Sequence, residues 1–200
     1  MDNQPKILAF AGSLRKESYN KKLVKIAVKG AEEAGAIVTY IDLKDYPLPI
    51  YDQEIEDSQG LPANAIKLKE LMRQNDGFLI SCPEYNSSMP AAFKNMIDWT
   101  SRPANPDEIY LSSTIDKAVV LMSASPGELG GLRGLVHVRA MLNNIFSIVL
   151  PQQKCISQAD QAFNPDGSLK DPKKQKDILK LGAKLTEFLI KCKSNSYATK

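Results

Sequence analysis

Nine residues near the amino terminus combine groups that bind phosphate in proteins. They form the run Gly12-Ser13-Leu14-Arg15-Lys16-Glu17-Ser18-Tyr19-Asn20, between a short apolar stretch and a helical pattern. Hydroxyls from Ser13 and Ser18, the Asn20 amide and the Arg15 guanidinium can donate hydrogen bonds to an anion, and a helix amino terminus adds free N–H groups. The run predicts a phosphate site. The same residues also allow a plainer interpretation, in which Ser18 or Asn20 only caps the helix and Arg15 is a surface charge.

Other phosphate-handling motifs do not fit this run. A Walker loop needs Gly-Lys-Ser/Thr five residues after Gly12, where Glu17 stands. A dinucleotide fingerprint needs glycines at the positions of Leu14 and Glu17. A phosphatase nucleophile is also missing, because no cysteine precedes Arg15 in the run.

A second distinctive run lies between two prolines, Pro83-Glu84-Tyr85-Asn86-Ser87-Ser88-Met89-Pro90. Each proline fixes its own φ and restricts the residue before it, so the run follows a stiffened path. A stiff loop can present backbone amides to the N5 and carbonyl edge of a flavin, with Tyr85 near the plane of the ring. The alternative is an ordinary turn between a strand and a helix.

The third run is rich in glycine, Ser123-Ala124-Ser125-Pro126-Gly127-Glu128-Leu129-Gly130-Gly131. Its three glycines and one proline permit close approach of the backbone to a flat ligand. In a plainer interpretation, Gly130 and Gly131 only open the next helix.

The elements that position these runs alternate between short apolar strands and helical periodicity, which is typical of βαβ units and a parallel sheet. Strands are expected at 6–11, 37–42, 77–81, 117–123 and 148–150. Helices are expected at about 20–34, from about 62, from 90 to about 101–103, at 132–145 and at about 172–192, with 43–60 as a long surface loop. The pattern predicts an α/β, doubly wound, five-stranded sheet of order 2-1-3-4-5 with helices on both faces. Because ligands bind beyond the carboxyl ends of such strands, the three runs should converge.

Composition limits the remaining classes. A length of 200 residues with 43% hydrophobic content suits a single domain spanning 1–200, with a loose tail after Ser194. No stretch approaches the roughly 20 apolar residues of a membrane span, and no signal-peptide pattern is seen, so a soluble cytoplasmic protein is expected. The net charge of +3 is too small to indicate a nucleic-acid protein, and one histidine and three dispersed cysteines give no metal motif.

With all three runs in view, the chain resembles the NADPH-dependent FMN reductase family, a flavodoxin-like group that includes quinone, azo-dye and chromate reductases. The resemblance extends over nearly the whole chain. It rests on the first two runs and on the stretches Lys94-Asn95-Met96-Ile97-Asp98-Trp99 and Gly130-Gly131-Leu132-Arg133, in that order and spacing. It implies a non-covalently bound FMN.

The resemblance also implies roles for individual residues. The FMN phosphate would be held by Ser13, Arg15, Ser18 and Asn20. The isoalloxazine would be lined by Pro83, Glu84, Tyr85, Asn86 and Ser87, and closed on its other side by Ser123, Ser125, Pro126 and Gly127. NADPH would pass hydride to the flavin, which would then reduce a small-molecule electron acceptor, with no catalytic side chain required. Candidates for contact with the NADPH 2′-phosphate are Arg15, Arg102 and Arg133.

Assembly is a further expectation from the resemblance, which implies a homodimer or homotetramer with Asp52 approaching the partner's site. The helix after Pro90 carries Ala92, Phe93, Met96, Ile97 and Trp99, too wide an apolar set for one stripe facing a sheet. Part of that set is expected to face another subunit, and a deeply buried helix in a monomer is the alternative.

Two departures from the family pattern, Ser88-Met89 and the longer stretch 104–116, leave the choice of acceptor open. Two other functional classes also stay open. One is a flavodoxin-type electron carrier, although such carriers are usually strongly acidic and have a Thr-rich phosphate loop. The other is a flavin-dependent regulatory partner.

Overall fold

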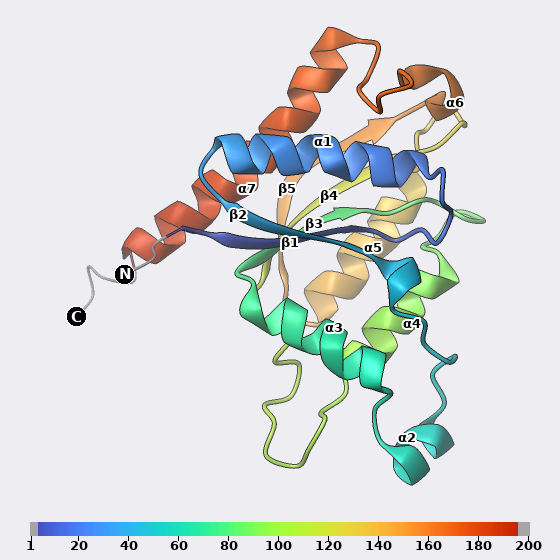
Figure 1. The fold of residues 1–200 in the computed structure, drawn as a ribbon, viewed down its shortest axis with the longest axis vertical. Helices are drawn as coiled ribbons and strands as arrows, with labels where there is room; N and C mark the ends of the chain where they lie inside the picture. Colours follow the sequence, from blue (N-terminus) through green and yellow to red (C-terminus); the bar gives the residue numbers. More distant parts are fainter. Residues whose placement is uncertain (1–3, 196–200) are drawn as a thin grey trace.

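The computed structural model describes residues 4–195 and is built on a five-stranded parallel sheet (Figure 1). Its strands are β1 (Lys6–Ala11), β2 (Ile37–Asp42), β3 (Gly77–Ser81), β4 (Ala118–Ala124) and β5 (Ile148–Ile156). They lie in the order β2-β1-β3-β4-β5, and every neighbouring pair is parallel. The predicted α/β class, the flavodoxin-like sheet and its strand order are therefore confirmed.

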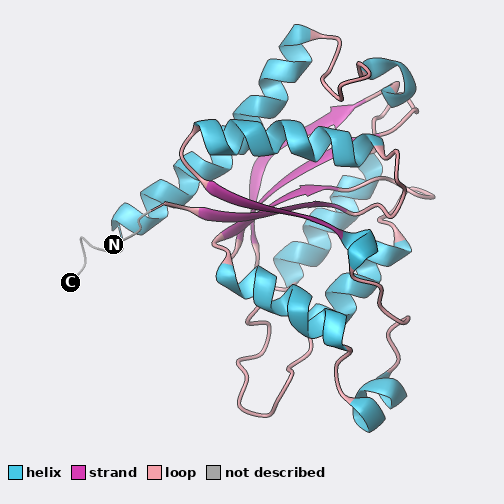
Figure 2. Ribbon diagram, viewed as in Figure 1, coloured by secondary structure: helices cyan, strands magenta, loops and turns pink. Residues whose placement is uncertain are grey.

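Helices cover both faces of the sheet. They are α1 (Tyr19–Glu33), α2 (Gln53–Gln59), α3 (Ala63–Gln74), α4 (Ala91–Thr100), α5 (Leu132–Asn144), α6 (Ala159–Ala162) and α7 (Pro172–Asn195), with a short 3₁₀ turn, η1 (Leu43–Asp45). Helices α1 and α7 lie side by side on one face, and α3, α4 and α5 lie on the other (Figures 1 and 2). Within residues 4–195, no helix is both long and apolar enough to cross a membrane.

The core divides along the alternation of each strand, because successive side chains point to opposite faces. In β1, Ile7 and Ala9 pack toward α1 and α7, while Leu8 and Phe10 pack toward α3 and α4. The two helices on the first face approach closely, since a Cβ on Gly182 would lie only 1.8 Å from the Ala27 carbonyl oxygen. This contact fixes α1, and with it the segment that leads into α1.

The segment 43–60, expected to be a surface loop throughout, contains η1 and α2. Helix α2 begins where the Asp52 side chain accepts a hydrogen bond from Glu54 N at 2.9 Å. It ends at Gly60, whose φ of 71° lies in the region that favours glycine. The expectation of loop was therefore wrong for residues 53–59, where the capping aspartate went unrecognised.

Strand β5 is longer than predicted and continues to Ile156. The strand was predicted to end at Leu150, just before Pro151, which cannot donate to a ladder. The pairing of β4 with β5 shifts register between Val119 and Leu121, and such an irregularity accommodates the proline. Helix α7 extends to Asn195, the first residue of the loose tail predicted after Ser194, and the rest of that tail lies outside the described residues.

The apolar surplus of α4 is buried within the chain. Phe93, Met96, Ile97 and Trp99 are each at most 3% exposed. The segment before α2 covers the helix, because the Trp99 indole N–H donates to the Pro49 carbonyl oxygen at 2.8 Å. The expectation that these four side chains face another subunit is therefore wrong, and the buried-helix alternative describes them.

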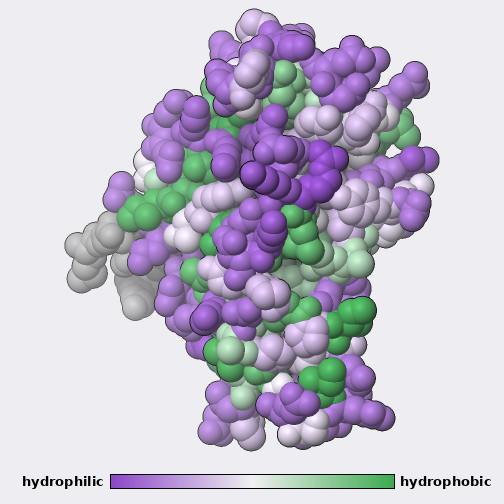
Figure 3. Space-filling view, turned by 45° about the vertical axis from the view of Figure 1, so that its right-hand side comes forward, coloured by the Kyte–Doolittle hydropathy of each residue, from purple (hydrophilic) through white to green (hydrophobic). Residues whose placement is uncertain are grey.

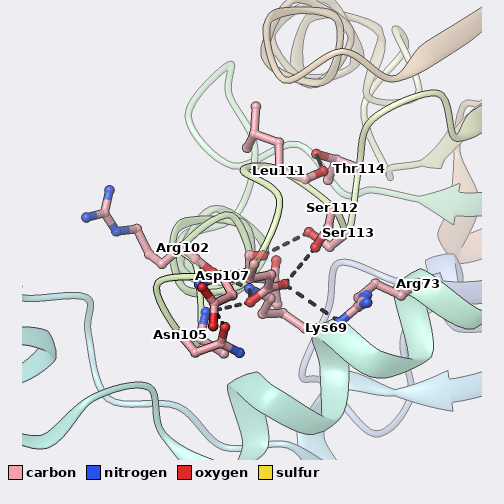
Figure 4. Close-up of polar contacts among 12 residues, drawn as sticks. Lys69, Arg73, Arg102, Asn105, Asp107, Leu111, Ser112, Ser113 and Thr114 are labelled. Atoms are coloured by element: carbon pink, nitrogen blue, oxygen red, sulfur yellow. Dashed lines mark hydrogen bonds and ion pairs between the residues drawn. The ribbon is translucent and has the colours of Figure 1, made fainter.

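The long connection from α4 to β4 is anchored by a buried ion pair (Figure 4). The Glu108 carboxylate accepts from Lys69 Nζ at 2.8 Å, from Ser112 Oγ at 2.6 Å and from Ala104 N at 2.6 Å. Both charged side chains are 5% exposed. Burial alone would raise the pKa of Glu108, but these hydrogen bonds and the Lys69 charge outweigh it and lower the pKa to about 2.

We expect Glu108→Gln to destabilise the chain at pH 7 by about 2–3 kcal/mol, because it removes a carboxylate with a depressed pKa and leaves Lys69 unpaired. A carboxyl group whose pKa is lower in the folded chain than in the unfolded chain stabilises the fold at pH values above the unfolded-chain pKa. This stabilisation is lost as the pH falls toward the folded-chain pKa. The difference in the free energy of unfolding between the parent and Glu108→Gln should therefore become smaller as the pH falls from about 4.5 toward about 2, the pKa of Glu108 in the folded chain. Urea unfolding at several pH values measures it.

Asp98→Asn is the matched control for this experiment. It removes the exposed Lys94–Asp98 pair, in which the two side chains are 49% and 32% exposed. Such pairs contribute about 0.5 kcal/mol or less. A stability loss in Glu108→Gln that did not change with pH would contradict the assignment.

Candidate cofactor site

The three runs singled out in the sequence meet at the carboxyl edge of the sheet, on the right in Figure 1. They enclose a pocket of about 70 Å³. Its lining comes from the loop after β1, the start of α1, the loop after β3, the end of β4 and the loop after β4. The residues are Ser13, Arg15, Ser18, Tyr19, Asn20, Pro83, Glu84, Tyr85, Ala124, Ser125 and Pro126. The convergence expected for a doubly wound sheet is therefore present.

The amino terminus of α1 supplies hydrogen-bond donors to this pocket. Ser18 occupies the N-cap position, but its side chain makes no capping hydrogen bond. The first backbone N–H groups of the helix have no acceptor in the described part of the chain, where the first bond in this turn is Lys22 N to Ser18 O. Ser13 Oγ accepts only a long 3.4 Å bond from Arg15 N. These free donors fit a phosphate group.

Asn20 has a supporting role that the sequence did not reveal. Its side chain is 3% exposed, and its amide nitrogen donates to the Ala124 carbonyl oxygen at 2.8 Å. Its amide oxygen accepts from Ala124 N at 3.0 Å and from Ser81 Oγ at 2.8 Å. The residue thus ties α1 to the ends of β3 and β4. Only one N–H of the Asn20 side chain is left to bind a ligand. The Ser18 hydroxyl, in contrast, makes no capping bond.

The loop after β3 forms a tight two-residue turn. Tyr85 N donates to Ser88 O at 2.9 Å, and Ser88 N donates back to Tyr85 O at 3.0 Å. The turn residues Asn86 and Ser87 have φ values of 50° and 64°, as a type I′ turn requires. Tyr85 is half exposed, so the turn presents an aromatic ring and two backbone N–H groups beside the pocket. The prolines indicated a stiff loop but not this turn.

Glu84 anchors that loop to another helix. Its carboxylate accepts from Arg133 Nε at 2.9 Å and from Gly134 N at 3.0 Å, at the amino terminus of α5. Burial would raise the pKa of Glu84, but these hydrogen bonds lower it below its usual range. A Cβ at Gly134 would lie 3.1 Å from Glu84 Cβ, so glycine there lets the loop pack closely on α5.

In the third run, Ser123 does not reach the pocket. It lies within β4, which ends at Ala124, one residue beyond the predicted end. Its side chain is fully buried beside Gly131, and its hydroxyl has no partner among the described residues. Ser123 is therefore not among the residues that line this pocket, where Ala124 and Ser125 stand. Gly127 lies just beyond, where its N–H donates to Ser125 Oγ at 3.3 Å.

The three candidate arginines differ in their partners. Arg102 pairs with Glu56 at 2.9 Å, and Arg133 pairs with Glu84 at 2.7 Å. Arg15 donates to the Glu17 carbonyl oxygen at 2.5 Å, and no carboxylate pairs with it in residues 4–195. Arg15 is thus the one of the three that combines an uncompensated charge with a place in the pocket wall.

The nearby thiol gives no sign of reactivity. Cys82 follows β3 but is 1% exposed, and burial raises its pKa. The donors at α1, a turn with two available N–H groups and a half-exposed tyrosine together fit a flat ring that carries a phosphate. The residues present therefore fit FMN.

The fold is that of a flavodoxin-like α/β protein, and its carboxyl edge carries a pocket with free hydrogen-bond donors. Residues 5–161 match the family model for NADPH-dependent FMN reductase. The chain therefore belongs to the NADPH-dependent FMN reductase family, whose members are NAD(P)H-dependent oxidoreductases of the FMN and quinone reductase type. The resemblance inferred from the sequence is confirmed.

Individual relatives agree with this membership. A probable NADPH:quinone oxidoreductase 2 of Oryza sativa subsp. japonica is 32% identical, over 93% of this chain and 89% of its own. An NAD(P)H-dependent FMN reductase of Pseudomonas aeruginosa is 34% identical, over 86% of this chain and 89% of its own. Among solved structures, FerB, a flavoenzyme NAD(P)H:(acceptor) oxidoreductase from Paracoccus denitrificans, superposes with a TM-score of 0.78 and 27% identity, over 94% of this chain and 98% of its own.

We expect Asn20→Ala to destabilise the chain in the absence of any ligand by about 2–4 kcal/mol, because it strands the buried N–H and C=O of Ala124. Chemical denaturation of the flavin-free protein measures this. Ser18→Ala is the control: it removes a hydroxyl that makes no capping bond, so its stability should change by less than about 0.5 kcal/mol. Equal stability of Asn20→Ala and the parent would show that the bridge to β3 and β4 is dispensable.

Proposed function

We propose that this chain is an FMN-dependent NAD(P)H oxidoreductase that passes hydride from NADPH, through bound FMN, to a small-molecule acceptor. Acceptors of this type are quinones, free flavin, azo dyes and metal oxyanions. The observation that carries the proposal is the convergence of the α1 amino terminus with the turn after β3 in one pocket. FMN is the resident cofactor, and NADPH is the reducing substrate.

Each part of the pocket has a role in this proposal. Ser13, Ser18 and Arg15 bind the phosphate together with the first N–H groups of α1. The backbone N–H groups of Asn86 and Ser87 bind the polar edge of the ring, and the Tyr85 side chain forms its wall. Across the pocket, the run 125–127 closes the other side. Hydride transfer requires no protein acid or base. The side chains therefore only bind and orient the FMN and leave one face of its ring open.

The purified chain should be yellow and should oxidise NADPH when a quinone or free FMN is added. Steady-state kinetics with NADPH and NADH, each against a panel of quinones, azo dyes and free FMN, measure the activity and rank the acceptors. A protein that neither binds FMN nor oxidises NADPH would overturn the proposal. An FMN protein reduced only by a partner protein would instead be an electron carrier, and redox-dependent binding to a partner without turnover would indicate a regulatory role.

We also propose that two copies assemble through the face around Ile50, as a homodimer or within a homotetramer. Ile50 is 85% exposed, although its neighbours are fixed: Asn95 bonds both the Pro49 carbonyl oxygen and Tyr51 N at 2.8 Å. Beside it lies a groove of about 520 Å³ whose apolar lining includes Leu14, Leu43, Leu48, Leu68, Ala91, Ala92 and Met96. Hydrophobic surface also gathers in the lower half of the face in Figure 3.

The exposed Ile50 side chain is an apolar projection beside an apolar groove. This pairing suits a two-fold interface, in which Ile50 of each copy fills the groove of the other. The support for assembly is therefore this exposed surface around Ile50 and not the buried apolar side chains of α4. The two-fold arrangement also keeps Asp52, which follows the projection by two residues, near the partner copy in the proposed dimer.

We expect Ile50→Asp to shift the chain toward monomer, because it places a charge in the apolar interface. Light scattering after gel filtration measures the mass of each species. Ile190→Asp, on α7 at the other face of the sheet and 44% exposed in the parent, serves as the control and should leave the assembly unchanged. A monomeric parent, or an Ile50→Asp variant that assembles as the parent does, would contradict this interface.

A further inference from the structure

Three side chains from separate segments stack beside the phosphate pocket. The Arg15 guanidinium lies over the Tyr19 ring, 5.3 Å from its centroid. The Tyr19 ring stacks in turn on Phe163, with centroids 6.0 Å apart and planes 8° from parallel. Both Arg15 and Tyr19 line the pocket, whereas Phe163 follows α6, far away in the sequence.

The two rings are held by the core. Tyr19 and Phe163 are partly buried, and both pack against the hydrophobic cluster between the sheet, α1 and α7. Phe163 also forms an isolated antiparallel bridge with Leu169, which is 4% exposed. The stack therefore has a fixed base in the core, and Arg15 at its other end is exposed to solvent.

This placement matters because Arg15 is a long side chain with a charge that no carboxylate compensates in the described part of the chain. A free arginine loses rotamer freedom when it binds an anion, which weakens binding. An arginine already stacked on an aromatic ring has lost part of that freedom before the anion arrives, and the cation–π contact adds to its order. Glu17 contributes one further contact, the carbonyl oxygen that accepts from Arg15.

We propose that Tyr19, supported by Phe163, is a positioning residue that holds Arg15 over the phosphate pocket, and that this stack makes the site select FMN over riboflavin. Riboflavin has the same ring and lacks only the phosphate. The inference deepens the proposed function and rests on it, since it assumes that the pocket binds the phosphate of a flavin. Tyr19 acts through Arg15 and not by direct contact with the reacting ring.

The test compares the affinity of the flavin-free, full-length protein for FMN and for riboflavin, measured by quenching of flavin fluorescence. Tyr19→Leu should weaken FMN binding by about threefold to tenfold. Its affinity for riboflavin should stay within about twofold of the parent, because the ring contacts are unchanged. Tyr19→Phe should behave as the parent, since the stack needs only the ring and the Tyr19 hydroxyl makes no hydrogen bond within residues 4–195.

A double-mutant cycle separates an effect through Arg15 from a direct one. Arg15→Gln should itself weaken FMN binding, by about tenfold. Adding Tyr19→Leu to Arg15→Gln should then cost little more, because the ring has no guanidinium left to position. Losses that multiply in the double variant would overturn the proposal, as would a Tyr19→Leu variant that loses FMN and riboflavin affinity equally.

Phe163→Leu tests the same preference for FMN over riboflavin with a substitution outside the pocket. It replaces Tyr19→Leu as the test if that variant fails to fold. It should reduce the preference for FMN in the same direction by a smaller factor, and an unchanged preference would count against the stack. A parent protein that binds FMN no better than riboflavin would overturn the phosphate assignment itself. A parent that prefers FMN, with a Tyr19→Leu variant that keeps the full preference, would overturn the positioning role alone.

Discussion

The site depends on one buried carboxamide. The side chain of Asn20 bonds both backbone groups of Ala124 and the hydroxyl of Ser81, and so joins the start of α1 to the ends of β3 and β4. Parallel strands bring their carboxyl ends to one edge, but they do not fix how the following loops meet there. The Asn20 bridge supplies that constraint, because it sets the position of the free helix terminus relative to the strands that carry the other loops.

Two further contacts extend this constraint to opposite faces of the sheet. On one face of the sheet, α7 fixes the position of α1, because Gly30 and Gly182 let the two helices lie in direct contact. The turn after β3 is fixed on the other face, where Glu84 binds the amino terminus of α5. The phosphate-binding and ring-binding parts of the proposed site are thus supported by different layers. The sheet between them keeps their spacing, and no single loop has to hold both.

Much of this arrangement could be predicted from local patterns. The alternation of strands and helices gave the sheet order, and the glycine- and proline-bounded runs marked the loops that meet. The missed features depend on partners distant in sequence: Asn20 bonds residues 61 and 104 positions away. A wide apolar set on α4 could not indicate that Pro49 and its neighbours cover it. The position of Ser123 at the end of a strand could not indicate that its side chain is buried away from the pocket. Apolar periodicity shows that a side chain is buried, but it does not show which part of the structure covers it.

The charges around the pocket suit a ligand with one anionic end. Among the residues that line it, Glu84 is the only carboxylate, and Arg133 and the α5 terminus neutralise it. Arg15 remains uncompensated beside the free N–H groups of α1, so the positive potential is confined to one end of the pocket. The other end offers backbone amides and the uncharged ring of Tyr85. An amphipathic molecule with a terminal phosphate can satisfy both ends at once, whereas a free anion or a bare ring satisfies only one.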